Sequence, residues 1–123
     1  PVRKDLMSTV TLYHYPQCST SRKALELLRE RGIEPTIVEY RKTPPSAAEI
    51  QAIARATGAP LRALLRTKEP EYLAQGLDNP QLTDAQLAAA LHATPALIER
   101  PIVVTAKGAR LGRPVEKILE VLD

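Results

Sequence analysis

The stretch TVTLYHYPQCSTSRKALELLRERG, residues 9–32, carries the pattern of a strand, a loop and a helix. Its first six residues are rich in β-branched and aromatic side chains, which favour a strand, and Pro16 ends that strand. From Ser19 to Arg31 the apolar residues recur at helical spacing. A second strand-forming run, Thr36 to Tyr40, completes the length of a βαβ unit, so we expect the first two strands to be parallel.

The middle of the chain contains two start signals for helices. Ser46 and Glu49 have the spacing of a capping box, and Thr83 repeats that spacing with a glutamine three residues later. The apolar run Leu61–Arg66, which follows a proline, predicts a further short helix. We therefore expect residues 44–98 to form a mostly helical insertion.

The end of the chain predicts an antiparallel hairpin and a last helix. A β-branched run from Arg100 to Thr105 is followed by a turn at Lys107 and Gly108, and residues 109–111 return as the partner strand. Pro114 is expected to be the first residue of the last helix. The apolar face of that helix is predicted to consist of Val115, Ile118, Leu119 and Leu122.

The order of these elements, βα, β, helical insertion, ββα, is that of an α/β fold. A chain of 123 residues is short for two domains, and 44% hydrophobic residues suffice for one core. We expect a single domain over residues 1–123, in which residues 1–8 are a flexible extension.

The composition argues against nucleic-acid and membrane partners. The aromatic residues are four tyrosines without Phe or Trp, which leaves few platforms for stacking bases. No apolar run approaches the roughly 20 residues that span a bilayer, and no apolar leader begins the sequence, so we expect a cytoplasmic protein. The net charge of +3 comes mainly from arginine, which suits the recognition of small oxyanions.

The candidate reactive group is Cys18, which lies between the first strand and the first helix. As the single cysteine it has no internal disulfide partner, so any redox chemistry needs an outside thiol, and with two histidines the chain lacks a closed zinc site. The amides and the dipole of a helix N-terminus favour a thiolate, and the Ser21 hydroxyl is expected to donate a hydrogen bond to the sulfur. The alternative is a buried, inert structural thiol.

Six motifs between about Thr9 and Leu122 point to a family. They are YHYPQCSTSR (13–22), EPT (34–36), TPP (43–45), LRALLR (61–66), ERPIVV (99–104) and LGRP (111–114). In this order they resemble the glutaredoxin-linked arsenate reductases. The resemblance implies a thioredoxin-like fold with a helical insertion and a cis peptide bond before Pro101. Tyr15 departs from the pattern, since members of the family often have a small amide residue there.

The resemblance also implies roles for individual residues. It makes Cys18 the nucleophile, and it makes three arginines the groups that hold the oxyanion: Arg66, Arg100 and Arg113. His14 and Ser21 match positions that tune the thiol, and we expect secondary contacts from Ser19, Thr20 and Arg22. Several guanidinium groups can both bind a tetrahedral anion and stabilise charge as an oxygen leaves.

In the mechanism that the resemblance implies, Cys18 attacks arsenate, glutathione displaces the arsenic to form a mixed disulfide, and glutaredoxin resolves that disulfide as arsenite is released. Glutathione is then a cosubstrate, and no tightly bound cofactor or metal is needed. One alternative is a general thiol–disulfide oxidoreductase, whose arginines would hold a glutathione carboxylate. Another is a regulator that resembles the Spx-type proteins, which bind RNA polymerase and typically carry Cys-x-x-Cys, a motif that Ser21 breaks.

Overall fold

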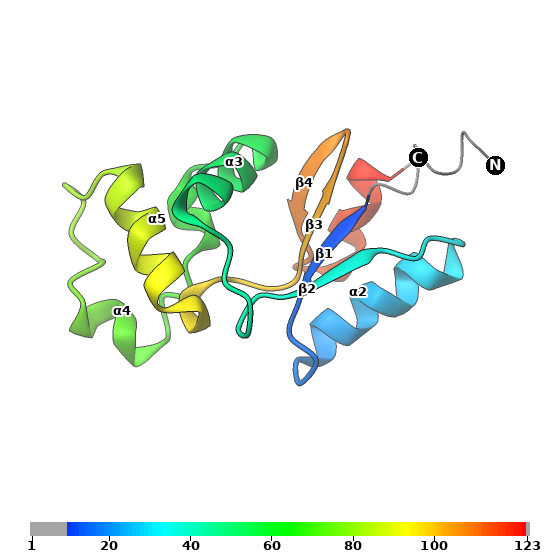
Figure 1. Ribbon diagram of the computed structural model, residues 1–123, viewed down its shortest axis with the longest axis horizontal. Helices are drawn as coiled ribbons and strands as arrows, with labels where there is room; N and C mark the ends of the chain where they lie inside the picture. The colour runs from blue at the N-terminus through cyan, green and yellow to red at the C-terminus, as the bar shows by residue number, and fades with distance from the viewer. Residues whose placement is uncertain (1–9, 123) are drawn as a thin grey trace. The chain divides into compact units, whose positions relative to one another are not determined.

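The computed structural model describes residues 10–122, and the predicted extension at residues 1–8 lies outside them (Figure 1). The described chain forms two compact units. The first, here called the sheet unit, contains the residues up to Tyr40 and those from Arg100 onward. The second, the helical unit, is Arg41–Glu99, which corresponds closely to the predicted helical insertion.

The sheet unit is built on four short strands. Its elements are β1 (Thr11–His14), α2 (Ser19–Glu30), β2 (Thr36–Glu39), β3 (Ile102–Thr105), β4 (Gly108–Leu111) and the 3-10 helix η3 (Val115–Val121). The strand order is β2-β1-β3-β4, with β1 and β2 parallel and the two other pairings antiparallel. This confirms the predicted βαβ unit and the predicted hairpin.

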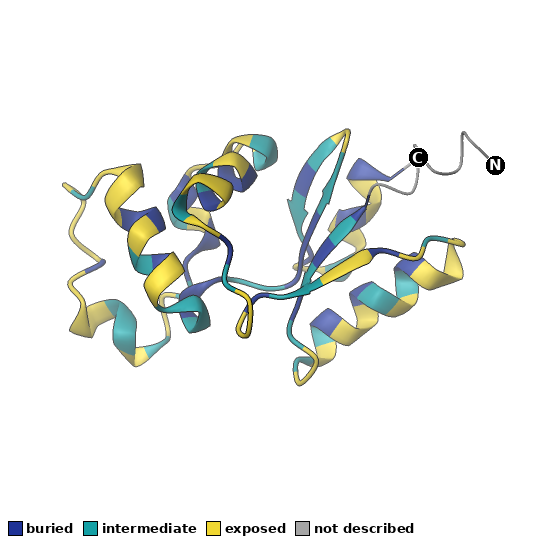
Figure 2. Ribbon diagram, in the orientation of Figure 1, coloured by how far each residue is buried: buried dark blue, intermediate teal, exposed yellow. Residues whose placement is uncertain are grey.

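The core of the sheet unit lies between one face of the sheet and the two helices α2 and η3. Leu12 of β1 pairs with Val103 of β3, and both are fully buried. Alternation along each strand turns these side chains to the same face, where they meet the buried side of α2 (Figure 2). Each such buried aliphatic side chain contributes about 1.5–3 kcal/mol. The remaining members of this core include Val10, Ala24, Leu28, Ile118, Val121 and Leu122.

The prediction for the last helix is wrong in two details. The segment is a 3-10 helix, and Pro114 precedes it in an extended conformation instead of being its first residue. Side chains three residues apart align in a 3-10 helix, so Ile118 and Val121 share the buried side. Leu119, which α-helical spacing places on the apolar face, is 37% exposed as a result.

The two longer helices of the helical unit begin where the sequence predicts. Its elements are α3 (Ala47–Thr57), the 3-10 helices η1 (Leu61–Leu64) and η2 (Pro95–Leu97), α4 (Pro70–Ala74) and α5 (Asp84–Ala93). At α3 the Ser46 hydroxyl accepts from the Glu49 amide at 3.1 Å, and the Ser46 amide donates to the Glu49 carboxylate at 2.9 Å. The same reciprocal pair of hydrogen bonds caps α5 at Thr83.

The predicted helix over Leu61–Arg66 is shorter than expected, because long-range pairing takes over its last residues. The 3-10 helix ends at Leu64, and Leu65 forms an antiparallel bridge with Ile98. The Arg66 amide then donates to the Leu97 carbonyl at 2.8 Å. Arg66 therefore leaves the helix and extends from a bridged segment.

Candidate functional site

Cys18 is held at the N-terminus of α2 by a tight turn. Its amide donates to the Tyr15 carbonyl at 2.9 Å, and its own carbonyl accepts from the Arg22 amide at 3.0 Å. Cys18 is the N-cap residue, with an extended backbone conformation (φ −92°, ψ 124°). The partly exposed sulfur thus lies next to the first free amides of the helix, where a negative charge is favoured.

The surroundings of Cys18 lower the pKa of its thiol. Partial burial raises the pKa, because it removes water from the thiolate, but four favourable interactions outweigh it. They are hydrogen bonds from the backbone amides of Ser21 and Thr20, a hydrogen bond from the Arg100 side chain and the charge of Arg100. The thiolate is therefore more populated near neutral pH than in an ordinary cysteine, as a nucleophile requires.

Ser21 acts on the sulfur through its backbone, and the prediction for its hydroxyl is wrong. The fully buried hydroxyl accepts from the Tyr15 amide at 3.0 Å and lies 2.6 Å from Nδ1 of His14. The side chain therefore bonds to these two buried groups instead of the sulfur. The amide of Ser21 instead donates to Cys18.

His14 is a buried side chain at the end of β1, 5% exposed. Burial is the main cause of a lowered pKa, with contributions from the charges of Arg22 and Arg29, whereas Glu39 acts in the opposite direction. The lowered pKa favours the neutral imidazole, whose Nδ1 lies against the Ser21 hydroxyl. The tuning role that the resemblance gives His14 stays a prediction.

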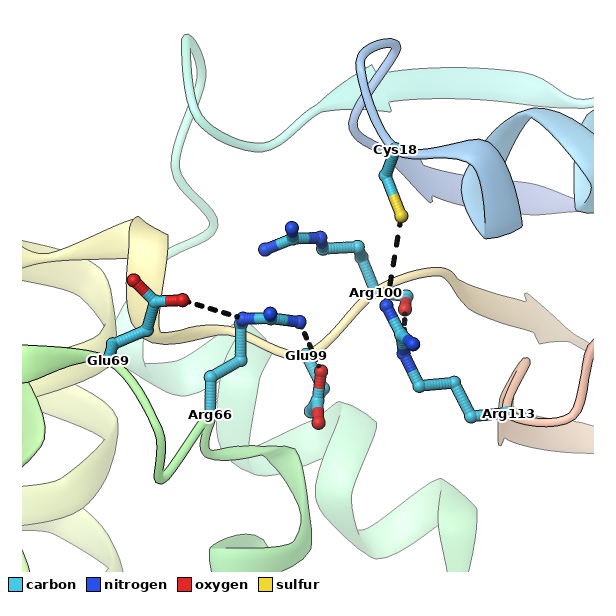
Figure 3. A network of polar contacts seen from close by, with 6 residues as sticks. All are labelled: Cys18, Arg66, Glu69, Glu99, Arg100 and Arg113. Carbon is cyan, nitrogen blue, oxygen red and sulfur yellow. Dashed lines mark hydrogen bonds and ion pairs between the residues drawn. The ribbon is translucent and has the colours of Figure 1, made fainter.

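Two of the three predicted arginines lie beside Cys18. Nη2 of Arg113 approaches the sulfur to 3.7 Å, and Nε of the same side chain donates to the Arg100 carbonyl at 2.7 Å (Figure 3). The Arg100 guanidinium hydrogen-bonds to Cys18 and lies over the Tyr15 ring, 4.9 Å from its centroid. Positive groups from the segments just before β3 and just after β4 thus converge on the N-terminus of α2.

Arg66 belongs to the helical unit, where it is held by two carboxylates. Its Nη1 lies 2.7 Å from Glu99 and its Nε 3.3 Å from Glu69 (Figure 3). Two donors of the guanidinium are therefore engaged within its own unit. The role that the resemblance gives Arg66 stays a prediction.

The remaining predicted residues lie in the first turn of α2. Thr20 contributes the backbone amide described above, and the Arg22 side chain donates to the Pro16 carbonyl at 2.8 Å. Ser19 is exposed and is the first residue of the helix. Arg22 therefore braces the loop that precedes Cys18.

Sequence reasoning missed the partners of the arginines. The Arg100 guanidinium lies over the Tyr15 ring, and the buried Tyr40 also interacts with the Arg100 side chain. The one available signal was an aromatic residue at position 15, within the cysteine motif. Glu99 begins the motif ERPIVV, but that motif does not identify it as the partner of Arg66, and nothing around Tyr40 distinguishes it from an ordinary residue at the end of a strand.

Gly112 allows the loops of the two arginines to pack closely. Its amide donates to the Pro101 carbonyl at 2.8 Å. A Cβ atom at this position would lie 2.8 Å from Cγ of Pro101 and 3.3 Å from Cγ2 of Ile118. The peptide bond before Pro101 is cis, as the resemblance implies, and so is the one between Arg113 and Pro114.

Residues 10–122 contain neither a cluster of metal ligands nor a helix that could span a membrane. Among them, no three His, Cys, Asp or Glu side chains come together in a way that could hold a metal ion. Nor does any helix in this part of the chain combine the length and apolar character needed to cross a bilayer.

The mixed sheet, with a cysteine at the N-terminus of its first helix and a helical insertion before β3, is a thioredoxin-like fold. The model of the ArsC family matches residues 13–121, and the chain belongs to that family. The arsenate reductase of Rhizobium meliloti (strain 1021) is 46% identical over 114 residues, 93% of this chain and 81% of that protein. An arsenate reductase of Escherichia coli is 46% identical over 116 residues, 94% of this chain and 82% of that protein. The structure of the arsenate reductase from Vibrio cholerae has a TM-score of 0.89 and 44% identity, covering 93% of this chain and 98% of that chain.

Proposed function

We propose that this protein reduces arsenate to arsenite, with Cys18 as the nucleophile and glutathione and glutaredoxin as the electron donors. The observation that carries the proposal is a thiol with a lowered pKa, flanked by Arg100 and Arg113, in a member of the ArsC family. Relatives named arsenate reductase, at 46% identity over most of the chain, support the choice of substrate.

The proposed reaction begins when the Cys18 thiolate attacks arsenic. A sulfur–arsenic bond forms, and one arsenate oxygen leaves as water after it gains protons. A glutathione thiolate then attacks the Cys18 sulfur, so that a disulfide forms and the electron pair of the sulfur–arsenic bond stays on arsenic, which leaves as arsenite. The two electrons come from the two thiols that form the disulfide.

The second half of the cycle restores Cys18. A glutaredoxin thiolate attacks the glutathione sulfur of the mixed disulfide, which releases the Cys18 thiolate. An external thiol is required because Cys18 is the single cysteine of the chain and Ser21 has no thiol.

Arg100 and Arg113 have two tasks in this proposal. Before the reaction they favour the thiolate, and during it they donate hydrogen bonds to the arsenate oxygens and stabilise charge on the leaving oxygen. The amides of Thr20 and Ser21 are further donors at the same place. Arg66 would be the third arginine on the anion, since its contacts with Glu69 and Glu99 use two of the five N–H groups of the guanidinium.

The test is a coupled assay that contains arsenate, glutathione, glutaredoxin, glutathione reductase and NADPH. We expect NADPH consumption that depends on arsenate, is abolished in Cys18→Ser and falls by about 10²–10³-fold in Arg100→Ala and Arg113→Ala, the range for loss of a donor to a developing charge. Arg55→Ala, which removes an exposed arginine from α3, is the matched control and should retain full activity. Turnover in Cys18→Ser at the wild-type rate would refute the proposal.

A general thiol–disulfide oxidoreductase is the second candidate, because two guanidinium groups beside a thiolate also fit a glutathione carboxylate. The two candidates differ in whether NADPH consumption depends on an oxyanion. A protein that consumes NADPH with a glutathionylated substrate at the same rate with and without arsenate would be an oxidoreductase of this kind.

A further inference from the structure

The Tyr15 side chain is fixed to the loop that carries Cys18. Its amide donates to the Ser21 hydroxyl at 3.0 Å, its carbonyl accepts from the Cys18 amide at 2.9 Å, and its hydroxyl donates to the Gln17 side chain at 2.8 Å. The two backbone hydrogen bonds thus hold Tyr15 on both sides, whereas the hydrogen bond of its hydroxyl is exposed. The ring has a defined place relative to the sulfur.

The Arg100 guanidinium lies over this ring, at 4.9 Å from its centroid. That distance falls within the roughly 6 Å over which a cation is attracted to an aromatic face. Nε of Arg100 is buried and has no hydrogen-bond partner among the described residues. Nε therefore does not set the position of the side chain. The Cys18 sulfur and Tyr40 also interact with the guanidinium, and the ring is the contact on its planar face.

A ring and a carboxylate hold an arginine in chemically different ways. Arg66 gives Nε and Nη1 to Glu69 and Glu99, which use its donors and offset its charge. A ring beneath the guanidinium contacts its face, so the N–H groups at the edge remain directed outward and the full positive charge is kept. Those are the properties needed by a group that must donate to a thiolate and to an oxyanion.

We propose that Tyr15 is a positioning residue, which holds Arg100 by its aromatic face against the loop that carries Cys18. Tyr15 acts through Arg100 and does not itself touch the reacting atoms. The part of this inference that concerns arsenate turnover rests on the proposed function, whereas the part that concerns the thiol does not.

The first test is the rate of Cys18 alkylation by iodoacetamide as a function of pH, which requires no arsenate. The charged groups that face the sulfur are Arg100 and Arg113, and His14 lies behind Ser21. Tyr15→Leu should lower the alkylation rate at pH values below the thiol pKa by between about twofold and thirtyfold, the range for an exposed to a desolvated cation–π contact. Tyr15→Phe keeps the ring face and should stay within twofold of the wild-type rate.

The second test separates positioning from a general structural role by a double-mutant cycle. If Tyr15 acts through Arg100, Tyr15→Leu should change the alkylation rate by less than twofold in an Arg100→Ala background. Gln17→Ala removes only the partner of the hydroxyl and should resemble the wild type. If Tyr15→Leu does not fold, as judged by circular dichroism, Tyr15→Met replaces it.

An equal loss in the wild-type and Arg100→Ala backgrounds would overturn the inference, and so would a Tyr15→Phe variant as slow as Tyr15→Leu. The same variants in the coupled assay extend the test to turnover. A protein that shows the alkylation pattern but does not reduce arsenate would retain the Tyr15 inference and lose the proposed function. If Tyr15→Leu changes neither the rate of arsenate reduction nor the rate of alkylation, the proposed function is retained and the Tyr15 inference is overturned.

Discussion

Arg113 makes the contact with Cys18 whose strength follows most directly from the structure. Replacing Arg113 with alanine removes a positive charge 3.7 Å from the sulfur. At that distance two unit charges interact by about 1 kcal/mol in a water-like dielectric, which is the appropriate value for an exposed arginine. We therefore expect a lower thiolate population in Arg113→Ala, by about fivefold at pH values below the thiol pKa.

The measurement is the pH dependence of alkylation, together with the ultraviolet absorbance of the thiolate. Arg110→Ala is the matched control, since Arg110 is a nearby arginine on β4 that bonds to Glu120 and to the Ala109 carbonyl. Added salt should reduce the difference between wild type and Arg113→Ala, because an exposed contact is screened. An Arg113→Ala profile that coincides with that of the control would show that the charge does not act on the thiolate, and the electrostatic account of this side chain would be refuted.

Three further predictions concern stability. Gly112→Ala should lower the free energy of unfolding by about 1–3 kcal/mol in urea denaturation, because a Cβ would lie 2.8 Å from Pro101, and an unchanged midpoint would contradict the close packing. Cys18→Ala should lose the part of the wild-type stability that depends on the thiolate: the folded pKa is below the unfolded one, so this contribution is present above the unfolded pKa and is lost as the pH falls through the folded pKa. A difference in the free energy of unfolding between wild type and Cys18→Ala that does not vary with pH would contradict this prediction. Ser46→Ala should cost about 1 kcal/mol through loss of the cap of α3, with Ser46→Thr as the control that retains a hydroxyl, and equal stability of both variants would argue against the capping box.

The parts of the fold that could be predicted from the sequence are those fixed by neighbouring residues. A capping box needs only two side chains three residues apart, so Ser46 and Thr83 could be identified without knowledge of the tertiary structure. The hairpin turn and the position of Cys18 before a helix are local in the same sense, although the turn lies one residue earlier than predicted, at Ala106 and Lys107, and Gly108 begins β4. Each of these features is confirmed.

The parts that could not be predicted depend on contacts between distant segments. Leu65 leaves its helix because Ile98, far along the chain, offers a bridge, and the last helix tightens to a 3-10 form as Ile118 and Val121 pack into the core. The same is true of the candidate site. Spacing alone could not show that Arg100 lies on an aromatic ring while Arg66 is paired with carboxylates.

At Ser21 the sequence predicts the right residue as a donor to the sulfur but the wrong donor group, the hydroxyl instead of the backbone amide. The sulfur receives a backbone amide from position 21, which any residue except proline would supply, so the thiol does not by itself require serine there. The serine is required by the two buried groups behind it, the Tyr15 amide and Nδ1 of His14, which one hydroxyl satisfies together. The Arg100 guanidinium lies over the Tyr15 ring. The Ser21 hydroxyl, which binds both His14 at the end of β1 and the Tyr15 amide, therefore also affects where that guanidinium lies relative to the sulfur. The serine of the Cys-x-x-Ser pattern, Ser21, therefore shapes the thiol's electrostatic environment indirectly, by fixing the backbone from which the Tyr15 ring projects.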